Sequence, residues 1–238
     1  LAATTGPRRA RYVPVGHRSL ESGPQIDLRA AIEALRSVLE DPSVAKIGHE
    51  LKADVIALGR RGVALRGVSF DSMLASYLLD ATRSEHPLED VALAHLGYRA
   101  LTAEDVCGRG AKALDLSDLP PSAVLDHACE RVDLPLQLVD VLEPLLERDH
   151  LSSLHRDLEL PLVPVLADLE RSGIKVDTGV LGRLSSRLEK ELSALSSRVF
   201  DLAGEQFNIN SPRQMAEILF DTLGLQSTKR PGKTRVAS

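Results

Sequence analysis

Two short stretches of the sequence combine side chains that can act in catalysis or metal binding. Asp54 follows Glu50 by four residues, and His127, Cys129 and Arg131 alternate along a segment with helical periodicity. Taken by themselves, Glu50 and Asp54 are explained as solvated helix carboxylates and His127 as a residue on a helix face. Cys129 has no Cys or His at the spacing of a zinc site, so we expect a small buried side chain there.

A third candidate is a basic segment close to the last residue. From residue 226 onward the sequence has no acidic residue, and a Pro-Gly pair interrupts it, which favours a loop over a helix. Lys and Arg side chains in such a loop can contact phosphates without regard to base sequence. The four basic residues of this segment are Lys229, Arg230, Lys233 and Arg235.

Composition limits the classes of protein that need to be considered. Of the 238 residues 43% are hydrophobic and 26% charged, which excludes collagen-like, low-complexity and wholly disordered chains. The formal net charge of −5 gives no overall positive field for nucleic acid. Aromatic residues make up only 3%, with no Trp, which argues against a surface that stacks nucleotide bases.

Cysteine usage and hydrophobicity indicate the compartment. Two cysteines make no disulfide framework and favour a reducing compartment. No apolar run approaches the roughly 20 residues of a membrane-spanning helix, and the first residues lack the layout of a signal peptide. We therefore expect a cytoplasmic protein without a membrane partner. The sequence starts without Met, in what resembles the middle of a strand, so we interpret it as part of a longer protein.

Strand and helix patterns alternate over the first eighty residues. Asp71 is placed to cap the helix that follows it. Such alternation predicts an α/β domain with a mixed sheet. The predicted elements are a hairpin over residues 1–18, strands over 46–49 and 63–70, and helices over 27–40, 51–60 and 72–79.

Helical periodicity dominates the rest of the sequence. Pro135 and Pro144 lie inside one predicted helix, where we expect kinks or breaks. A Ser-Pro-Arg-Gln sequence at 211–214 predicts a helix start at which Gln214 reaches back to the cap amide. We expect a domain boundary near residue 150. The predicted elements are helices over 88–96, 121–146, 151–171, 179–203 and 212–223, a loop over 101–118 and a short strand over 174–177.

Several stretches, taken together and in order, resemble a known family. They include GHELKAD at 48–54 and FDSMLASY at 70–77, and the most specific is AGEQFNINSPRQ at 203–214. These stretches are similar to bacterial family A DNA polymerases of the DNA polymerase I type, and the resemblance extends over essentially the whole chain. The other stretches that carry it are residues 11–17, 160–166 and 173–177.

The resemblance implies a domain layout. Residues 1–150 would be a ribonuclease H-like 3′–5′ exonuclease domain that lacks its first strand and first motif. Residues 151–238 would begin the polymerase domain and include the start of its thumb. The polymerase active site, with its Mg²⁺, would lie outside the chain, and the four basic residues would approach primer–template DNA. A bacterial, nucleoid-associated monomer is the expected parent.

The resemblance also places the exonuclease motifs. The family holds two metal ions with carboxylates from an Asp-x-Glu, an Asn-x-x-x-Asp and a Tyr-x-x-x-Asp motif. The second motif matches Glu50 to Asp54 and keeps only the Asp. The third matches His127 to Arg131, so a guanidinium stands where a metal-binding carboxylate is expected. A permanent cation repels Mg²⁺.

No neighbouring acid is expected to compensate. Asp126 and Glu130 are shifted by one residue, about 100° around the helix, and Asp133 is about 200° away. Arg131 is then free to pair with Asp54 or with another remaining acid. We therefore predict a catalytically inactive exonuclease domain with a structural role and no bound metal.

Two alternatives remain at this point. The domain could be an active, metal-dependent 3′–5′ proofreading exonuclease, in which Asp54 would be a metal ligand. Alternatively, the chain could be an interaction scaffold unrelated to polymerases, with the helix over 179–203 as a coiled-coil seam. The scaffold alternative predicts self-association.

Overall fold

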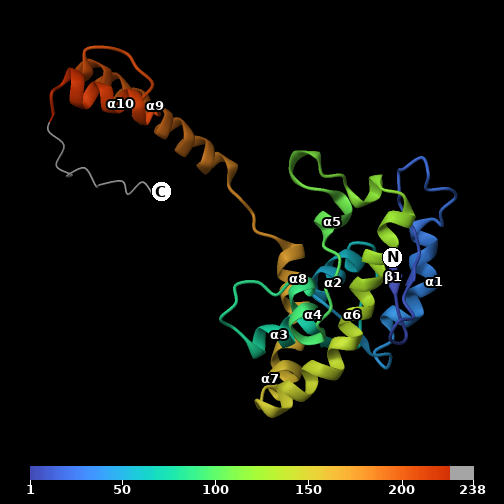
Figure 1. The fold of residues 1–238 in the computed structure, drawn as a ribbon. Helices are drawn as coiled ribbons and strands as arrows, with labels where there is room; N and C mark the ends of the chain where they lie inside the picture. Colours follow the sequence, from blue (N-terminus) through green and yellow to red (C-terminus); the bar gives the residue numbers. More distant parts are fainter. Residues whose placement is uncertain (226–238) are drawn as a thin grey trace, which may run out of the picture. The chain divides into compact units, whose positions relative to one another are not determined.

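The computed structural model describes residues 1–225 and divides the chain into two compact units (Figure 1). The first unit ends at Gly173 and the second begins at Ile174. This division differs from the expected boundary near residue 150, because residues 151–173 pack into the first unit. The assignment of these residues to the start of a polymerase domain remains a prediction.

The strands of the first unit form two small sheets. β1 (Ala2–Ala3) pairs antiparallel with β2 (Arg11–Tyr12), which confirms the predicted hairpin. β3 (Lys46–Gly48) pairs parallel with β4 (Val68–Asp71). β4 is shorter than the predicted strand over 63–70, and the paired strands make two separate sheets in place of one mixed sheet.

Helices make up most of the first unit. Asp71 accepts hydrogen bonds at the start of α3, as predicted, and Asp27 does the same at the start of α1. Gly97 ends α4 with a φ of 64°. The helices are α1 (Leu28–Glu40), α2 (Leu51–Gly59), α3 (Ser72–Leu79), α4 (Leu88–Leu96), α5 (Ala103–Cys107), α6 (Pro121–Arg148), α7 (Ser152–Leu154) and α8 (Leu160–Ser172).

The prediction of a loop over 101–118 was wrong, and so was the prediction of a helix break at Pro135 or Pro144, whereas a kink there stays a prediction. The segment over 101–118 contains α5, which begins with a capping box between Thr102 and Asp105, and two short 3-10 turns. α6 continues through Pro135 and Pro144 without a break. Each proline removes one helical hydrogen bond, but the helix buries a long apolar face that offsets this loss.

α6 supplies one side of the hydrophobic core (Figure 1). Leu138, Leu142 and Leu146 on this helix are completely or almost completely buried. They share one core cluster with residues of α3, α4 and β4. The remaining buried members of this cluster are Phe70, Ala75, Leu88, Val91, Ala92, Ala100 and Leu134. The helix therefore fixes the relative positions of α3, α4 and β4.

Residues 151–173 are joined to the first unit by buried and charged contacts. The His155 ring lies 4.9 Å from the Phe70 ring, centroid to centroid, and is itself buried. On α8, Glu170 forms an ion pair with Lys52 of α2, with 2.6 Å between Nζ and Oε1. These contacts explain why the compact unit extends past residue 150.

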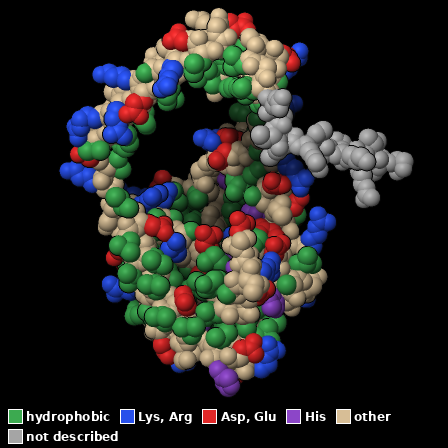
Figure 2. Space-filling model, turned by 90° about the vertical axis from the view of Figure 1, so that its left-hand side faces the viewer, with side chains coloured by type: hydrophobic (Ala, Val, Ile, Leu, Met, Phe, Trp, Pro, Cys, Tyr) green, Lys and Arg blue, Asp and Glu red, His purple; other side chains and the backbone are tan. Residues whose placement is uncertain are grey.

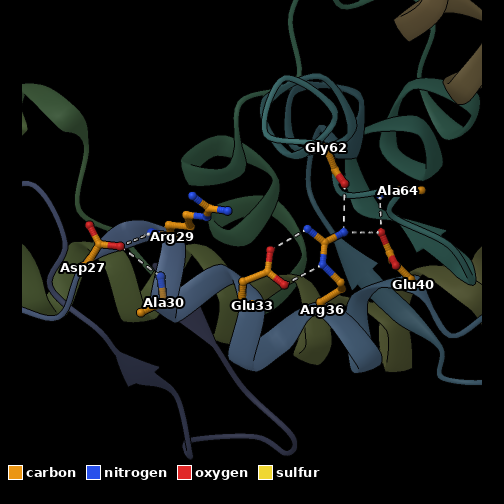
Figure 3. A network of polar contacts seen from close by, with 8 residues as sticks. All are labelled: Asp27, Arg29, Ala30, Glu33, Arg36, Glu40, Gly62 and Ala64. Atoms are coloured by element: carbon orange, nitrogen blue, oxygen red, sulfur yellow. Dashed lines mark hydrogen bonds and ion pairs between the residues drawn. The ribbon is translucent and has the colours of Figure 1, made fainter.

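A network of charged side chains on α1 forms hydrogen bonds with the backbone of Gly62 and Ala64, which follow α2 (Figure 3). The Arg36 guanidinium donates to Glu33 and Glu40 on its own helix, and to the carbonyl oxygen of Gly62 at 2.8 Å. Glu40 in turn accepts from the Ala64 amide at 3.1 Å. The predicted helix over 27–40 is thus confirmed, and its second half is tied to the loop that leads toward β4.

The second unit is helical in its described part. It contains α9 (Thr178–Ala203) and α10 (Pro212–Ala216), and α10 continues as a π-helical turn over Glu217–Thr222. The helix predicted over 179–203 is confirmed. The strand predicted over 174–177 was wrong: these residues form no strand, and Ile174 has no partner strand and is 93% exposed.

The cap that precedes α10 differs in one detail from the prediction. Ser211 accepts from the Gln214 amide at 3.4 Å, as expected. The Gln214 side chain, however, accepts from the backbone amide of Asn208 at 2.7 Å and not from that of Ser211. The turn before the helix therefore brings Asn208, rather than the cap residue, within reach of the Gln214 amide oxygen.

The exposed surface mixes side chains of all types. Figure 2 shows acidic and basic groups side by side, with hydrophobic side chains between them. The hydrophobic side chains on α9 include six exposed leucines, which are Leu181, Leu184, Leu188, Leu192, Leu195 and Leu202. Within residues 1–225 no helix combines the length and hydrophobicity that crossing a bilayer requires.

Candidate relict exonuclease site

A buried carboxylate sets the position of the helix that carries Asp54. Asp71, at the end of β4, accepts hydrogen bonds from the backbone amides of Glu50 at 3.0 Å and Leu51 at 2.7 Å. The same carboxylate accepts from the amides of Met73 and Leu74 at the start of α3. One side chain therefore caps two helices, and both of its oxygens are occupied by backbone donors.

Glu50 has an unusual backbone conformation at the start of α2. Its φ of 60° and ψ of 45° place it in the left-handed region, and its side chain makes no capping hydrogen bond. Asn is enriched in this conformation relative to most other residues, whereas a Glu is strained there. The Asn of the family motif therefore suits this turn, and the Glu is tolerated because Asp71 holds the amide that follows.

Asp54 lies on α2 with its side chain open to solvent. Surrounding protein atoms still remove part of its hydration, and this desolvation raises the pKa of the Asp54 carboxyl above its usual value. The guanidinium of Arg131 acts in the opposite direction, and the carboxylates of Asp71 and Glu50 add to the rise. The Asp54 carboxyl is thus influenced by charges of both signs.

Arg131 forms an ion pair with Glu89 and not with Asp54. Its Nη1 lies 3.4 Å from Oε1 of Glu89, which is in the first turn of α4. The charge of Arg131 nevertheless acts on Asp54, because it lowers the pKa of that carboxyl. Of the two ion-pair partners that the sequence left open, the structure excludes direct contact with Asp54.

The histidines around Arg131 are held in the neutral form. Burial lowers the pKa of His49 to about 4, and the positive charge of Arg131 contributes to this shift. Burial and Arg131 also lower the pKa of His127, which is buried on α6. His49 contacts the Ser72 hydroxyl through Nδ1 at 2.9 Å. Arg131 is therefore the permanent cation among these side chains.

The acids that could have replaced the motif carboxylate at position 131 line a hollow away from Asp54 and Arg131. Asp126, Glu130 and Asp133 line a hollow of about 760 Å³ to which neither Asp54 nor Arg131 contributes. Glu130 accepts from the Tyr98 hydroxyl at 2.7 Å and from a backbone amide. The one-residue shift thus turns Asp126 and Glu130 toward this hollow, and the two-residue shift does the same for Asp133.

The donor set at Asp54 does not fit a two-metal site. Two divalent ions about 3.5–4 Å apart require several carboxylates directed at one point. Among residues 1–225, no three His, Cys, Asp or Glu side chains are grouped so that they could hold a metal ion. Asp71, a buried acid whose charge acts on Asp54, uses its oxygens on backbone amides, and Arg131 brings a cation.

The remaining candidate residues have ordinary surroundings or lie outside the described part. Cys129 is half-buried rather than fully buried, with a free thiol whose pKa is raised by partial burial. Lys229, Arg230, Lys233 and Arg235 fall beyond residue 225, outside the described residues. Contact with primer–template DNA stays a prediction for these four residues.

Sequence reasoning missed two residues of this region. Asp71 was predicted as the cap of α3, but its bonds to α2 join residues twenty positions apart, for which no local signal exists. Glu89 is 42 positions from Arg131. Because Glu89 follows Pro87 in the first turn of α4, the sequence could have predicted an acid at a helix start. It could not have predicted that Arg131 is the partner of this acid.

Comparison with known proteins identifies both parts of the chain. A sequence model of the "DNA polymerase I, ribonuclease H-like domain" matches residues 24–138, and a model of "DNA polymerase family A" matches residues 178–238. Residues 24–138 therefore match a ribonuclease H-like domain, and residues 178–238 match part of a family A polymerase. The chain belongs to the family A DNA polymerases, in the DNA polymerase I group.

Individual relatives agree with this assignment. DNA polymerase I of Pseudomonas aeruginosa is 40% identical over 219 residues, which are 91% of this chain and 24% of the relative. DNA polymerase I of Rhizobium leguminosarum is 38% identical over 91% of this chain and 22% of the relative. The chain thus spans about a quarter of the length of these relatives.

A solved structure is similar as well. The POL domain of Pol1 from M. smegmatis, in complex with DNA primer-template and dNTP, matches with a TM-score of 0.62 and 33% sequence identity. The match covers 85% of this chain and 32% of that one. The resemblance inferred from the short sequence stretches is confirmed.

Proposed function

We propose that this chain is part of a DNA-directed DNA polymerase of replication and repair, in which the exonuclease-like body is catalytically inactive and structural. The polymerase active site and its Mg²⁺ lie outside the chain in this proposal. The observation that supports it most is Arg131: the position of a motif carboxylate holds a guanidinium, and that guanidinium is paired with Glu89. Two magnesium ions beside a permanent cation would be repelled.

The test is a nuclease assay on the full-length protein. A single-stranded DNA labelled at its 5′ end is incubated with Mg²⁺ and no nucleotides, and shortening from the 3′ end is measured. We expect no difference between the unaltered protein and Asp54→Ala. The polymerase activity of the same preparations controls for folding. Restoration of Asp at 131 and Tyr at 127 is required before degradation appears.

Robust 3′–5′ degradation that Asp54→Ala abolishes would favour the alternative of an active proofreading exonuclease. In that case a metal site would have to form with acids contributed from outside residues 1–225. Degradation that persists in Asp54→Ala would point to a contaminating nuclease instead. The comparison of the two proteins therefore decides between the two functions.

The second part of the proposal concerns DNA contact. We propose that Lys229, Arg230, Lys233 and Arg235 contact the primer–template backbone through the thumb of the intact, monomeric protein. The Pol1 structure that matches this chain is a complex with DNA primer-template, which supports a DNA partner. A bacterial cytoplasmic location in association with the nucleoid follows from this partner.

Salt dependence tests these contacts. Each phosphate that a Lys or Arg side chain neutralises makes the slope of log K against log salt steeper by about 0.9 for duplex DNA. Removal of one such contact makes the slope shallower by the same amount. Changing all four residues to Ala in the full-length protein is therefore expected to weaken primer–template binding and to flatten its salt dependence. Unchanged affinity and slope at two salt concentrations would remove the idea.

A further inference from the structure

Glu89 is a carboxylate that needs a counter-ion. It lies in the first turn of α4, and only 19% of its side chain is exposed. A charge removed from water to this degree is costly unless it is paired. Among the described residues, Arg131 is the cation that forms an ion pair with it. The pair joins α6 to the start of α4.

The charge of Arg131 also reaches α2 and the turn before it. The charge of Arg131 acts to lower the pKa of Asp54 on α2 and of His49, which lies just before α2. It also lowers the pKa of His127, which lies one turn before Arg131 on α6. Arg131 on α6 thus contacts a carboxylate of α4, and its charge acts on groups of α2 through space without a direct contact. Burial keeps the two histidines neutral, so the guanidinium is left to balance the carboxylates.

The charge balance explains what the substitution at 131 accomplishes. With an Asp at this position, the half-buried Glu89 would face a second carboxylate in place of a guanidinium, and a bound cation would be needed to offset their repulsion. With Arg, Glu89 is paired with a guanidinium that is covalently part of α6. The positive charge is then supplied by the chain and not by the solution.

We propose that Arg131 is a built-in counter-ion, which takes the electrostatic place of divalent metal between α4 and α6 and keeps the exonuclease-like body ordered without metal. This inference rests on the proposed loss of exonuclease function. It goes further, because it gives the substituted residue a role of its own in holding the body together. Arg131 acts here as a positioning residue and not as a catalytic one.

Hydrogen exchange of the full-length protein tests the role locally. In Arg131→Met the amides of the first turn of α4 are expected to exchange about tenfold faster, because Glu89 is left unpaired. Arg131→Lys keeps the charge and is expected to retain most of the protection. Glu89→Gln combined with Arg131→Met removes both charges and is expected to restore protection toward that of the unaltered protein.

The chain offers a matched control on the same helix. Arg83 pairs with Asp90, the neighbour of Glu89, with 3.2 Å between Nη2 and Oδ2, but 58% of the Asp90 side chain is exposed. An exposed pair contributes little, so Arg83→Met is expected to leave exchange in α4 within about twofold of the unaltered protein. A general effect of removing an arginine would instead change both variants equally.

A second experiment measures the same hydrogen exchange in the presence of Mn²⁺ and in EDTA. The unaltered protein is expected to exchange equally in Mn²⁺ and in EDTA, whereas Arg131→Asp exchanges faster in EDTA and is slowed again by Mn²⁺. Unchanged exchange in Arg131→Met, or protection of the unaltered protein by Mn²⁺, would overturn the inference. Nuclease activity of the unaltered protein would instead refute the proposed function, so the two failures are distinguishable.

Discussion

Asp71 offers the most informative stability test, because one side chain caps two helices. Its Oδ1 accepts from the amides of Glu50, Met73 and Leu74, and its Oδ2 accepts from the amide of Leu51 at 2.7 Å. Asp71→Ala removes all four acceptor contacts. Loss of a helix cap costs about 1 kcal/mol, and each buried amide left without a partner costs about 1–3 kcal/mol.

These contributions give an expected loss of about 4 kcal/mol for Asp71→Ala. Asp71→Asn keeps one oxygen acceptor but turns an amide group toward the Leu51 N–H, so we expect a loss of about 2 kcal/mol. Asp27 is the matched control, because it caps only α1, through the amides of Arg29 and Ala30, on the exposed surface. Asp27→Ala is expected to cost about 1 kcal/mol.

The assay is urea denaturation followed by far-ultraviolet circular dichroism, with the variants compared by their midpoints at constant slope. The expected order of stability is unaltered protein, Asp27→Ala, Asp71→Asn and Asp71→Ala. If Asp71→Ala lost no more stability than Asp27→Ala, the double cap would not be the interaction that positions α2, and the placement of Asp54 would need another explanation.

Four further substitutions test the backbone and the charges of the first unit. A Cβ at Gly67, where φ is 72°, would lie 2.5 Å from the Val44 carbonyl oxygen. Gly67→Ala is therefore expected to lower the free energy of unfolding, measured by urea denaturation, by about 2–4 kcal/mol. Gly62 is the control, because it has a φ of 73° but open space around it, and Gly62→Ala is expected to lower the same quantity by only about 1 kcal/mol. Glu50→Asn relieves a left-handed Glu and is expected to raise the thermal midpoint, and a fall would contradict the strain argument. His49 has a pKa of about 4 when folded and about 6.5 when unfolded, so its contribution to stability is complete above pH 6.5 and is lost as the pH falls toward 4. The loss reaches up to about 3 kcal/mol, and His49→Asn is expected to flatten urea midpoints measured between pH 7 and pH 5.

Local patterns were sufficient to predict most of the helices. The helix over 27–40 and the long helix over 179–203 have regular apolar spacing, and Asp27, Asp71 and Ser211 supply caps that act within three residues. The predictions failed where tertiary packing overrides local rules. α6 tolerates two prolines because its apolar face is buried along its length.

The site itself could be predicted only in part. The resemblance located Asp54 and Arg131, and helix geometry correctly turned Glu130 away from them. The pairing of Arg131 with Glu89 and the bonds from Asp71 to α2 join residues far apart in sequence, and a single sequence carries no record of such contacts. The charge balance of the site became visible only once these partners were known.

The most direct test of the central claim is anomalous diffraction from crystals of the full-length protein grown with Mn²⁺ and a mononucleotide. The substitution of a guanidinium for a carboxylate predicts no pair of manganese peaks beside Asp54, with Arg131 still paired to Glu89. Two peaks about 3.5–4 Å apart, with Asp54 as a ligand, would contradict the account.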